Sequence, residues 1–360
     1  MRLKLIDKYI IFKFLSTVGF VILLINSIIT VIDYGEKSDN FMKPEISLQA
    51  IIFDYYVNFW LHLTNMLSPI TIFIATVFVT AQLAARTEIV AILASGVSFS
   101  RLLVPYLGGA SLLAIISFGA TGWIIPHANK TRVDFDNTYI KGKYIYNQRD
   151  VHFKVAPNTF VYFQNYNNTA HIGYSFTMEK IINNQLVEKL TAPQISWDTL
   201  KQIWHIAEYK THRFDGEQEK IETGRNMDTV LSLTFKDFET THLLHEALTL
   251  PELDEYIELQ TARGNTNLGV FYVEKYERYT NPFAMVVLTF MGVIISAKKS
   301  RQGIGMQIAL GFLIAFAFFI FVRLARSLGQ AGSIEPLIAA FIPITVFAII
   351  TLIMNKLISK

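Results

Sequence analysis

The chain has 360 residues, of which 52% are hydrophobic, and its mean hydropathy is +0.35. This composition is too apolar for an ordinary soluble protein and indicates an integral membrane protein. Residues 127–273 carry 15 basic and 19 acidic side chains, whereas the rest of the chain carries 17 and 10, so an acidic soluble middle separates two basic membrane portions. Because the chain has no cysteine, a disulfide, a thiolate metal site and a cysteine nucleophile are excluded.

Three apolar runs precede the soluble middle, at about 9–32, 63–83 and 102–125. Each is long enough to cross a bilayer, which takes about 20 residues. We expect the first run to be retained as a span, since the residues after Ile32 offer no small-residue cleavage site. The sequence also predicts a polar loop over 33–45, a kink at Pro69 and an exit from the membrane at Pro126.

The stretch from Ala84 to Arg101 lies between the second and third runs. It predicts a short helix at the cytoplasmic surface, with Thr87 as its N-cap and Gly96 in a left-handed conformation at its end. Ser98 is then expected to start the next helix.

Along this short helix, Ile89, Ile92 and Leu93 form an apolar stripe at helical spacing, while Ala91 and Ala94 keep the neighbouring surface small. A helix of this kind suits a groove on another protein. The alternative is an ordinary linker whose apolar side rests on lipid head groups.

Short β-rich runs separated by turn residues follow Pro126. The predicted strands lie at 144–146, 151–155, 159–163, 171–178, 186–190, 203–209 and 230–235. Many short strands at such spacing predict an antiparallel sandwich or jelly roll, whose edge strands are available for pairing with another protein. Residues 250–262 return to helical periodicity and lead back to the membrane.

Three further apolar runs lie at about 283–297, 306–328 and 336–358. The expected fold is an α-helical membrane protein with six transmembrane helices in a 3+3 plan and an inserted all-β jelly-roll domain. We divide the chain into 1–126, with helices 1–3 and the short helix near 86–96; 127–249, the β domain; 250–275, a helical return segment; and 276–360, with helices 4–6.

Basic residues gather on one side of the predicted spans. That side carries Arg2, Lys4, Lys8, Arg86, Arg101, Lys298, Lys299, Arg301, Lys356 and Lys360, against only Asp7 and Glu88. By the positive-inside rule this side is cytoplasmic and includes both ends of the chain. The β domain is then external, which in a Gram-negative cell means periplasmic, and the protein is expected in the inner membrane.

The sequence contains neither a Gly-x-x-x-x-Gly-Lys-Ser/Thr phosphate loop nor a Gly-x-Ser-x-Gly nucleophile motif. We therefore expect neither ATP hydrolysis nor other catalysis by this chain. His242 and His245 are three residues apart with Glu246 adjacent, but no His-Glu-x-x-His pattern or further ligand cluster supports a metal site. We expect no cofactor in this chain.

Six basic residues lie near the external ends of the predicted spans: Lys37, Lys43, Lys130, Arg132, Arg323 and Arg326. The positive-inside rule would not place them there, so they are candidates for contact with the phosphates of an anionic lipid, to which arginine donates bidentate hydrogen bonds. The alternative is that they snorkel to the head groups of bulk lipid.

Over essentially its full length the chain resembles the lipopolysaccharide-export permease family of the LptF/LptG (YjgP/YjgQ) type. The resemblance rests on 5–10, on 86–89 continuing to 94–96, on 123–126, on 276–282 and on 332–343. The exit at 122–126 and the N-terminal match favour an LptG-like over an LptF-like subunit.

The resemblance implies a noncatalytic permease of an ABC exporter that extracts lipopolysaccharide from the inner membrane. A separate cytoplasmic LptB-like ATPase would hold the ATP and magnesium and would dock on the helix near 86–96, the family's coupling helix. The implied coupling residues are Arg86, Glu88, Ala91, Ala94 and Gly96. A second LptF-like or LptG-like permease completes the complex, and LptC/LptA-like jelly-roll proteins receive the lipid.

The family's basic positions after the first and third spans correspond to Lys37, Lys130 and Arg132. Thr30, however, stands near the position at which some relatives carry a lysine in the first span. Asp136 stands near the position at which a second arginine of the family would fall. Either the head group of the transported lipid differs here, or Arg323 and Arg326 bind the head group in place of the missing basic residues. Two other functions stay open: a membrane-anchored scaffold whose β domain binds periplasmic partners, or an ABC permease for another amphiphile such as a lipoprotein or glycolipid.

Overall fold

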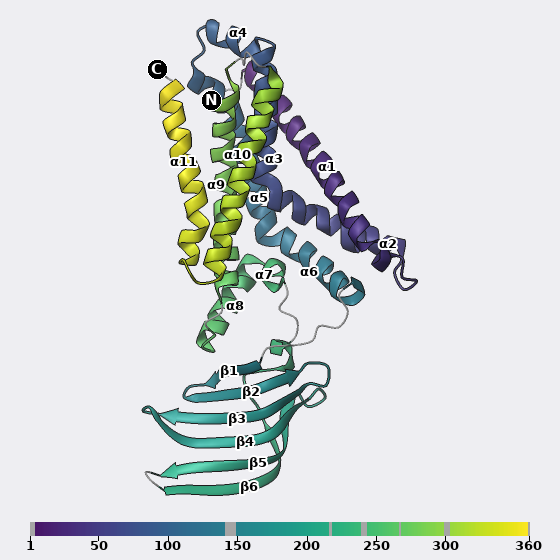
Figure 1. Cartoon of the computed structure of the whole chain (residues 1–360), viewed down its shortest axis with the longest axis vertical. Helices are drawn as coiled ribbons and strands as arrows, with labels where there is room; N and C mark the ends of the chain where they lie inside the picture. The colour runs from purple at the N-terminus through teal and green to yellow at the C-terminus, as the bar shows by residue number, and fades with distance from the viewer. Residues whose placement is uncertain are drawn as a thin grey trace. The chain divides into compact units, whose positions relative to one another are not determined.

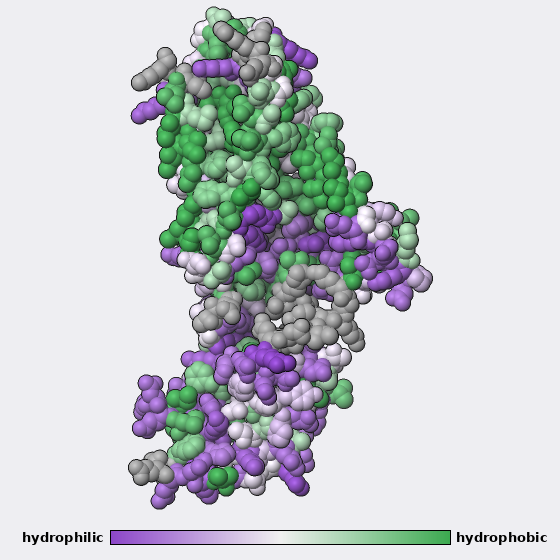
Figure 2. Space-filling view, viewed as in Figure 1, coloured by the Kyte–Doolittle hydropathy of each residue, from purple (hydrophilic) through white to green (hydrophobic). Residues whose placement is uncertain are grey.

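The computed structural model describes residues 4–140, 149–215, 218–238, 243–265, 268–298 and 303–358. It divides into two compact units. The membrane unit comprises Met1–Ile140, His245–Leu253 and Gly269–Lys360, and the β unit comprises Lys141–Leu244 and Asp254–Leu268. Six helices within the described residues are long and apolar enough to cross a membrane. Figure 2 shows mostly apolar surface on the membrane helices and mostly hydrophilic surface on the sheet.

The N-terminal part of the membrane unit is almost entirely helical (Figure 1). Its elements are α1 (Leu5–Phe41), α2 (Leu48–Ala50), the π-helical η1 (Ile51–Tyr56), α3 (Val57–Ala85), α4 (Glu88–Ala94), α5 (Phe99–Gly119), the π-helical η2 (Ala120–Ile124), α6 (Ile125–Phe135) and the π-helical η3 (Asp136–Ile140). The three predicted spans are thus confirmed, but their helices are longer than the apolar runs. Pro69 lies inside α3, which is continuous from Val57 to Ala85.

Two predicted boundaries in this part are wrong. The loop expected over 33–45 is helical as far as Phe41, because Lys37 pairs with Asp33 one turn earlier, at 2.9 Å between Nζ and Oδ1. Phe41 is also buried and packs edge-on against the ring of Tyr55. The helix expected to end at Pro126 continues, because this proline falls in the first turn of α6, where a missing N–H is tolerated.

The remaining helices are α7 (Leu244–Ala247), α8 (Leu250–Ala262), α9 (Gly269–Ser296), α10 (Ile304–Gln330) and α11 (Pro336–Ile358). Helix α8 confirms the helical periodicity of 250–262. The fourth span begins earlier than its apolar run, at Gly269. The Cβ that an alanine would add there falls 2.6 Å from the carbonyl oxygen of Gln330, so only glycine permits this approach between α9 and the end of α10.

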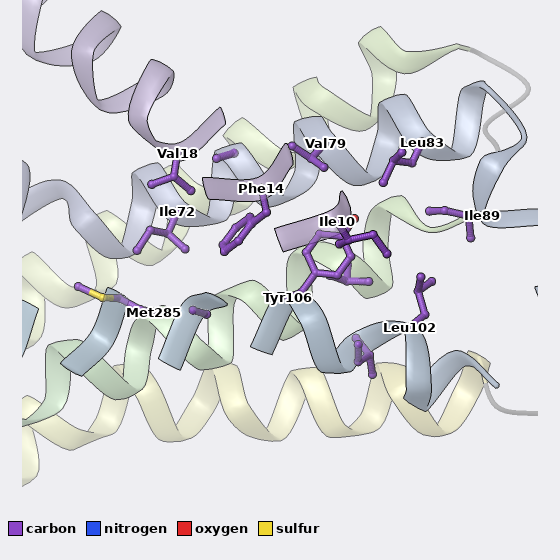
Figure 3. Close-up of a cluster of buried hydrophobic side chains, with 14 of the residues drawn as sticks. Ile10, Phe14, Val18, Ile72, Val79, Leu83, Ile89, Leu102, Tyr106 and Met285 are labelled. Atoms are coloured by element: carbon purple, nitrogen blue, oxygen red, sulfur yellow. The ribbon is translucent and has the colours of Figure 1, made fainter. Parts of the chain in front are cut away.

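The core of the membrane unit includes a cluster at one end of α1, α3 and α5 (Figure 3). Phe14 of α1 is fully buried, and its ring meets Tyr106 of α5 edge to face, with centroids 5.8 Å apart. Gly109 lets α5 approach this ring, since a Cβ there would lie 2.9 Å from Phe14 Cδ1. Large side chains on α1 therefore fill spaces left by small residues on α5.

The strands form one six-stranded antiparallel sheet in the order β1-β2-β3-β4-β5-β6. They are β1 (Arg149–Ala156), β2 (Thr159–Asn167), β3 (Ile172–Ile182), β4 (Gln185–Asp198), β5 (Ile203–Asp215) and β6 (Gln218–Thr229). The inserted all-β domain is thus confirmed, and its described strands follow one another as a meander. Five of the predicted strands correspond to β1–β5, and the run at 144–146 lies outside the described residues.

The sheet bends along a line that crosses β2 to β6. Each of these strands has two successive exposed residues that interrupt the alternation: 164–165, 174–175, 193–194, 207–208 and 225–226. Ser175 and Asn226 have positive φ, and Pro193 offers no N–H to its neighbour. Such irregularities bend and twist strands. Buried residues therefore continue on the same side of the sheet beyond the bend.

The strand predicted at 230–235 is wrong. This segment leaves β6 and brings Leu233 and Phe238 into the apolar core of the β unit, where both are almost fully buried. Trp204 Nε1 donates a hydrogen bond to the Leu233 carbonyl at 2.7 Å, and Phe238 stacks on Tyr166 with ring centroids 3.8 Å apart. The apolar residues that suggested a strand thus cover the sheet's apolar face.

Candidate functional site

The short helix α4 begins and ends at the residues that the sequence indicated. Gly96 has φ of 87°, which confirms the left-handed end, and the Ser98 hydroxyl accepts a hydrogen bond from the Arg101 N–H at 3.3 Å as it caps α5. Thr87 does precede α4, but its side chain makes no cap, which corrects the prediction. Thr87 has φ of 61°, and its hydroxyl instead donates to the Arg86 carbonyl at 2.6 Å.

Helix α4 has one buried and one exposed side. Ile89 is fully buried in the cluster of Figure 3, whereas Val90 is 51% and Leu93 37% exposed. Arg86, Ala91, Ala94 and Gly96, which are predicted to be coupling residues, are also exposed. The outer surface is therefore small and apolar, which suits a shallow groove on a partner.

Glu88 differs from the other coupling residues because its carboxylate binds within the chain. The Tyr9 hydroxyl of α1 donates a hydrogen bond to Glu88 Oε2 at 2.9 Å, and Lys13 Nζ lies 3.8 Å from Oε1. Glu88 therefore connects the coupling helix to the first span.

A second candidate region is a cavity of about 100 Å³ inside the membrane unit. Its apolar wall includes Met66, Ile70 and Phe318, and its polar lining combines carboxylates with three arginines. The charged and imidazole residues that line it are His62, Glu246, Glu274, Glu277, Arg278, Arg323 and Arg326. Helices α3, α9 and α10 supply most of them, so separate spans converge on one polar space.

The two arginines of α10 have different surroundings in this cavity. Arg326 is paired with Glu274, at 3.0 Å between Nη2 and Oε2, and with Glu277. Arg323 is exposed; Met66 Sδ lies 3.0 Å from its Nη2, and its guanidinium lies 5.1 Å from the centre of the Phe319 ring. Among the described residues no carboxylate lies within ion-pair distance of Arg323, so its guanidinium lines the cavity without a direct ionic contact.

Lys37 and Arg132 belong to a network of ion pairs inside the membrane unit. Lys37 contacts Asp33 and Tyr55, and both cations approach Asp136, at 3.9 Å for Lys37 and 3.7 Å for Arg132. Arg132 also lies 3.5 Å from Glu246. These contacts join α1 to η1 and η3, and α6 to α7.

The other two head-group candidates have different positions. Lys43 Nζ donates to the Tyr139 carbonyl at 2.8 Å, and Lys130 is exposed on α6. The structure therefore does not gather the six basic residues into one cluster. It leaves Arg323 as the one that combines exposure with a place in the cavity wall.

Several residues of the polar cavity were not singled out from the sequence. Arg278 is 2% exposed and donates to the carbonyls of Leu248, at 2.7 Å, and His245, at 2.9 Å, so it fixes the segment containing α7 onto α9. Glu274 lies one turn before Arg278, at 3.2 Å from its Nε. The only signal in the sequence was a dense group of charges directly before an apolar run. This pattern is equally typical of charged residues that lie at the membrane surface next to a span.

Glu246 of α7 lies outside the spans, and burial raises the pKa of its carboxyl above the ordinary range, although nearby Arg132 acts in the opposite direction. His245 Nε2 lies 3.9 Å from Glu246 Oε1, and His242 lies outside the described residues. Within the part of the chain that the structure describes, no three histidine or acidic side chains are grouped to hold a metal ion.

Comparison with known proteins adds the family. Residues 8–356 match the family described as lipopolysaccharide export system permease LptF/LptG. Two similar proteins are the lipopolysaccharide export system permease proteins LptG of Escherichia coli strain K12 and of Escherichia coli O6:H1 strain CFT073. Each is 19% identical over 282 residues, covering 75% of this chain and 76% of the relative. Because the family match extends over nearly the whole chain and agrees with six spans and an inserted sheet, this chain belongs to the LptF/LptG family of lipopolysaccharide-export permeases.

Proposed function

We propose that this chain is the noncatalytic permease subunit of an ABC exporter that extracts lipopolysaccharide from the inner membrane. The observation that carries the proposal is Arg323, a guanidinium that has no direct ion pair and lines a cavity with an apolar wall. A lipid with phosphates on its head group offers an anion to the arginine, while its acyl chains would lie outside this small cavity. The pairing of Arg326 with two carboxylates keeps a second arginine nearby without adding free charge.

The energy would come from a separate LptB-like ATPase that binds the exposed side of α4. The surface formed by Val90, Ala91, Leu93 and Ala94 supports this role, because a small apolar face packs closely into a groove. The positive-inside rule supports cytoplasmic ends of the chain and a periplasmic β unit. A second, LptF-like permease would complete the membrane assembly.

We also propose that the β unit receives the lipid and passes it to LptC/LptA-like jelly-roll proteins. Its buried face is apolar and aromatic, with Phe163, Phe176 and Trp204 at the centre, which is the chemistry that suits acyl chains; because Leu233 and Phe238 cover this face, lipid would have to displace their segment. Strand β6 lies at the edge of the sheet, and an edge strand has backbone groups available for pairing with a neighbouring sheet.

The test is purification of the complex in mild detergent, with identification of its proteins and of bound lipid by mass spectrometry. The native chain should bring down an ABC ATPase, a second six-span permease and lipopolysaccharide. Ala91→Trp places a bulky ring on the exposed side of α4 and should lose most of the ATPase but keep the second permease. Ser100→Trp is the matched control, because Ser100 is also small and exposed but lies on α5.

Each outcome decides between the functions considered. A different bound amphiphile with the same proteins would support a permease for that lipid and reject lipopolysaccharide as cargo. A native chain that yields neither ATPase nor lipid in any detergent that preserves it would favour the scaffold. Equal ATPase content in both tryptophan variants would reject α4 as the docking site.

A further inference from the structure

Two sets of polar contacts join the first turns of α1 to the segment that contains α4. On one side of α4 in the sequence, Arg101 Nη2 lies 2.5 Å from Asp7 Oδ2. On the other, Glu88 accepts a hydrogen bond from Tyr9, which itself accepts one from Lys13 Nζ at 2.8 Å. The first residue of α4 and the first turn of α5 are thus both tied to α1.

Apolar packing between these contacts makes the connection rigid. Ile10 and Ile89 are fully buried and Leu102 is 2% exposed, and the three side chains belong to the same cluster (Figure 3). A displacement of α4 away from α1 would open this cluster and separate the ion pairs. Close-packed elements tend to move as one body, so α4 and the beginning of α1 should move together.

The middle of α1 is packed less tightly than α3. Only 11% of its most apolar window is buried, compared with 67% for the span that contains α3. Within the membrane α1 meets α3 through few polar contacts, in which Asn26 donates to the Thr64 hydroxyl at 2.8 Å and Trp60 donates to Thr30 at 2.7 Å. Contacts of Lys37 and Phe41 hold the other end of α1, so a displacement of its first turns would tilt the helix about that end.

We propose that Tyr9 and Lys13 are positioning residues through which Glu88 moves α1 when the coupling helix moves. This inference rests on the proposed function, since it needs an ATPase that drives α4. It gives Glu88 a role inside this chain: the carboxylate links the docking helix to the first span. The exposed Val90 and Ala91 are then left to contact the partner.

The test is Tyr9→Phe, which removes the hydroxyl but keeps the ring. Purified complexes in lipid nanodiscs are compared for ATPase content, ATP hydrolysis and lipopolysaccharide released to acceptor protein per ATP hydrolysed. The variant should keep the ATPase and hydrolyse ATP, but its lipid released per ATP should fall about tenfold, as expected for one lost hydrogen bond to a charged group. Tyr34→Phe, in an exposed residue near the other end of α1, is the matched control and should match the native complex.

A double-mutant comparison tests whether Tyr9 acts through Glu88. Glu88→Gln should reduce lipid release per ATP, and combining it with Tyr9→Phe should add little. The inference would be overturned if the double variant showed the product of the two single losses of lipid release per ATP. It would also be overturned if Tyr9→Phe released as much lipid per ATP as the native complex. Neither result would contradict the transport function. Loss of the ATPase from Glu88→Gln but not from Tyr9→Phe would also overturn it, because Glu88 would then be a direct partner contact. A native complex without lipid release would instead reject the proposed function and this inference together.

Discussion

Arg323 and Arg326 lie one turn apart on α10, yet Arg326 is paired with two glutamates while Arg323 meets a thioether and an aromatic ring. An anionic ligand would therefore gain from Arg323 without first displacing a carboxylate. We expect Arg323→Ala to weaken binding of lipopolysaccharide to the purified complex by about 10- to 100-fold, the range for loss of a hydrogen bond to a charged group. Titration with labelled lipid measures this, and unchanged affinity would remove Arg323 from the site.

Arg326→Ala should act on stability instead. It leaves Glu277 without its cation in a largely buried setting, while Glu274 keeps Arg278, and removal of one partner from a buried pair costs about 3–5 kcal/mol. We expect a clearly lower midpoint of thermal unfolding in detergent for Arg326→Ala than for Arg323→Ala. Partial recovery in the triple variant Arg326→Ala, Glu274→Gln, Glu277→Gln would confirm that unpaired charge is the cause. Equal midpoints in the two arginine variants would contradict this assignment.

The segment that leaves β6 makes a further prediction possible. Phe238 is fully buried among the aromatic rings of the sheet, so Phe238→Ala should destabilise the β unit by about 3–5 kcal/mol. Val230→Ala, at a position 80% exposed in the same segment, should change stability by less than about 0.5 kcal/mol. Hydrogen exchange of the β2–β5 amides in the full chain measures both. Similar exchange in the two variants would mean that the segment does not support the sheet.

The apolar runs of the sequence were sufficient to predict the spans, because about 20 successive apolar residues have few stable arrangements other than a membrane-spanning helix. Hydropathy failed to predict the helix boundaries where polar side chains pair with one another inside the protein. The helix through 33–41 depends on Lys37 reaching Asp33 and Tyr55, and hydropathy alone represents none of these pairings. Strand β6 was missed for a related reason: Gln218–Thr229 is almost wholly polar and pairs at the edge of the sheet.

The candidate site was predictable in part. The exposure of Ala91 and Ala94 follows from their helical spacing around the buried Ile89. The different surroundings of Arg323 and Arg326 did not follow, because they depend on which residues of α9 and α3 lie opposite each one. Sequence spacing places two residues on one face of a helix, but the neighbouring helix decides whether each charge is neutralised.

The first turn of α8 provides a prediction about pH. Thr249 donates both its backbone N–H, at 2.8 Å, and its hydroxyl, at 2.7 Å, to Glu252 Oε2, and these bonds lower the pKa of the Glu252 carboxyl below its ordinary value. A carboxyl whose pKa is depressed in the folded state stabilises it above the unfolded pKa and loses that contribution as pH falls through the folded value. Protection of the Leu253 amide, whose N–H donates to the Thr249 carbonyl, should therefore decrease below about pH 4.5, the ordinary glutamate range. Glu252→Gln should have lower protection at neutral pH and a flatter pH dependence. An identical pH profile in native and variant chains would show that this carboxylate does not control the start of the helix.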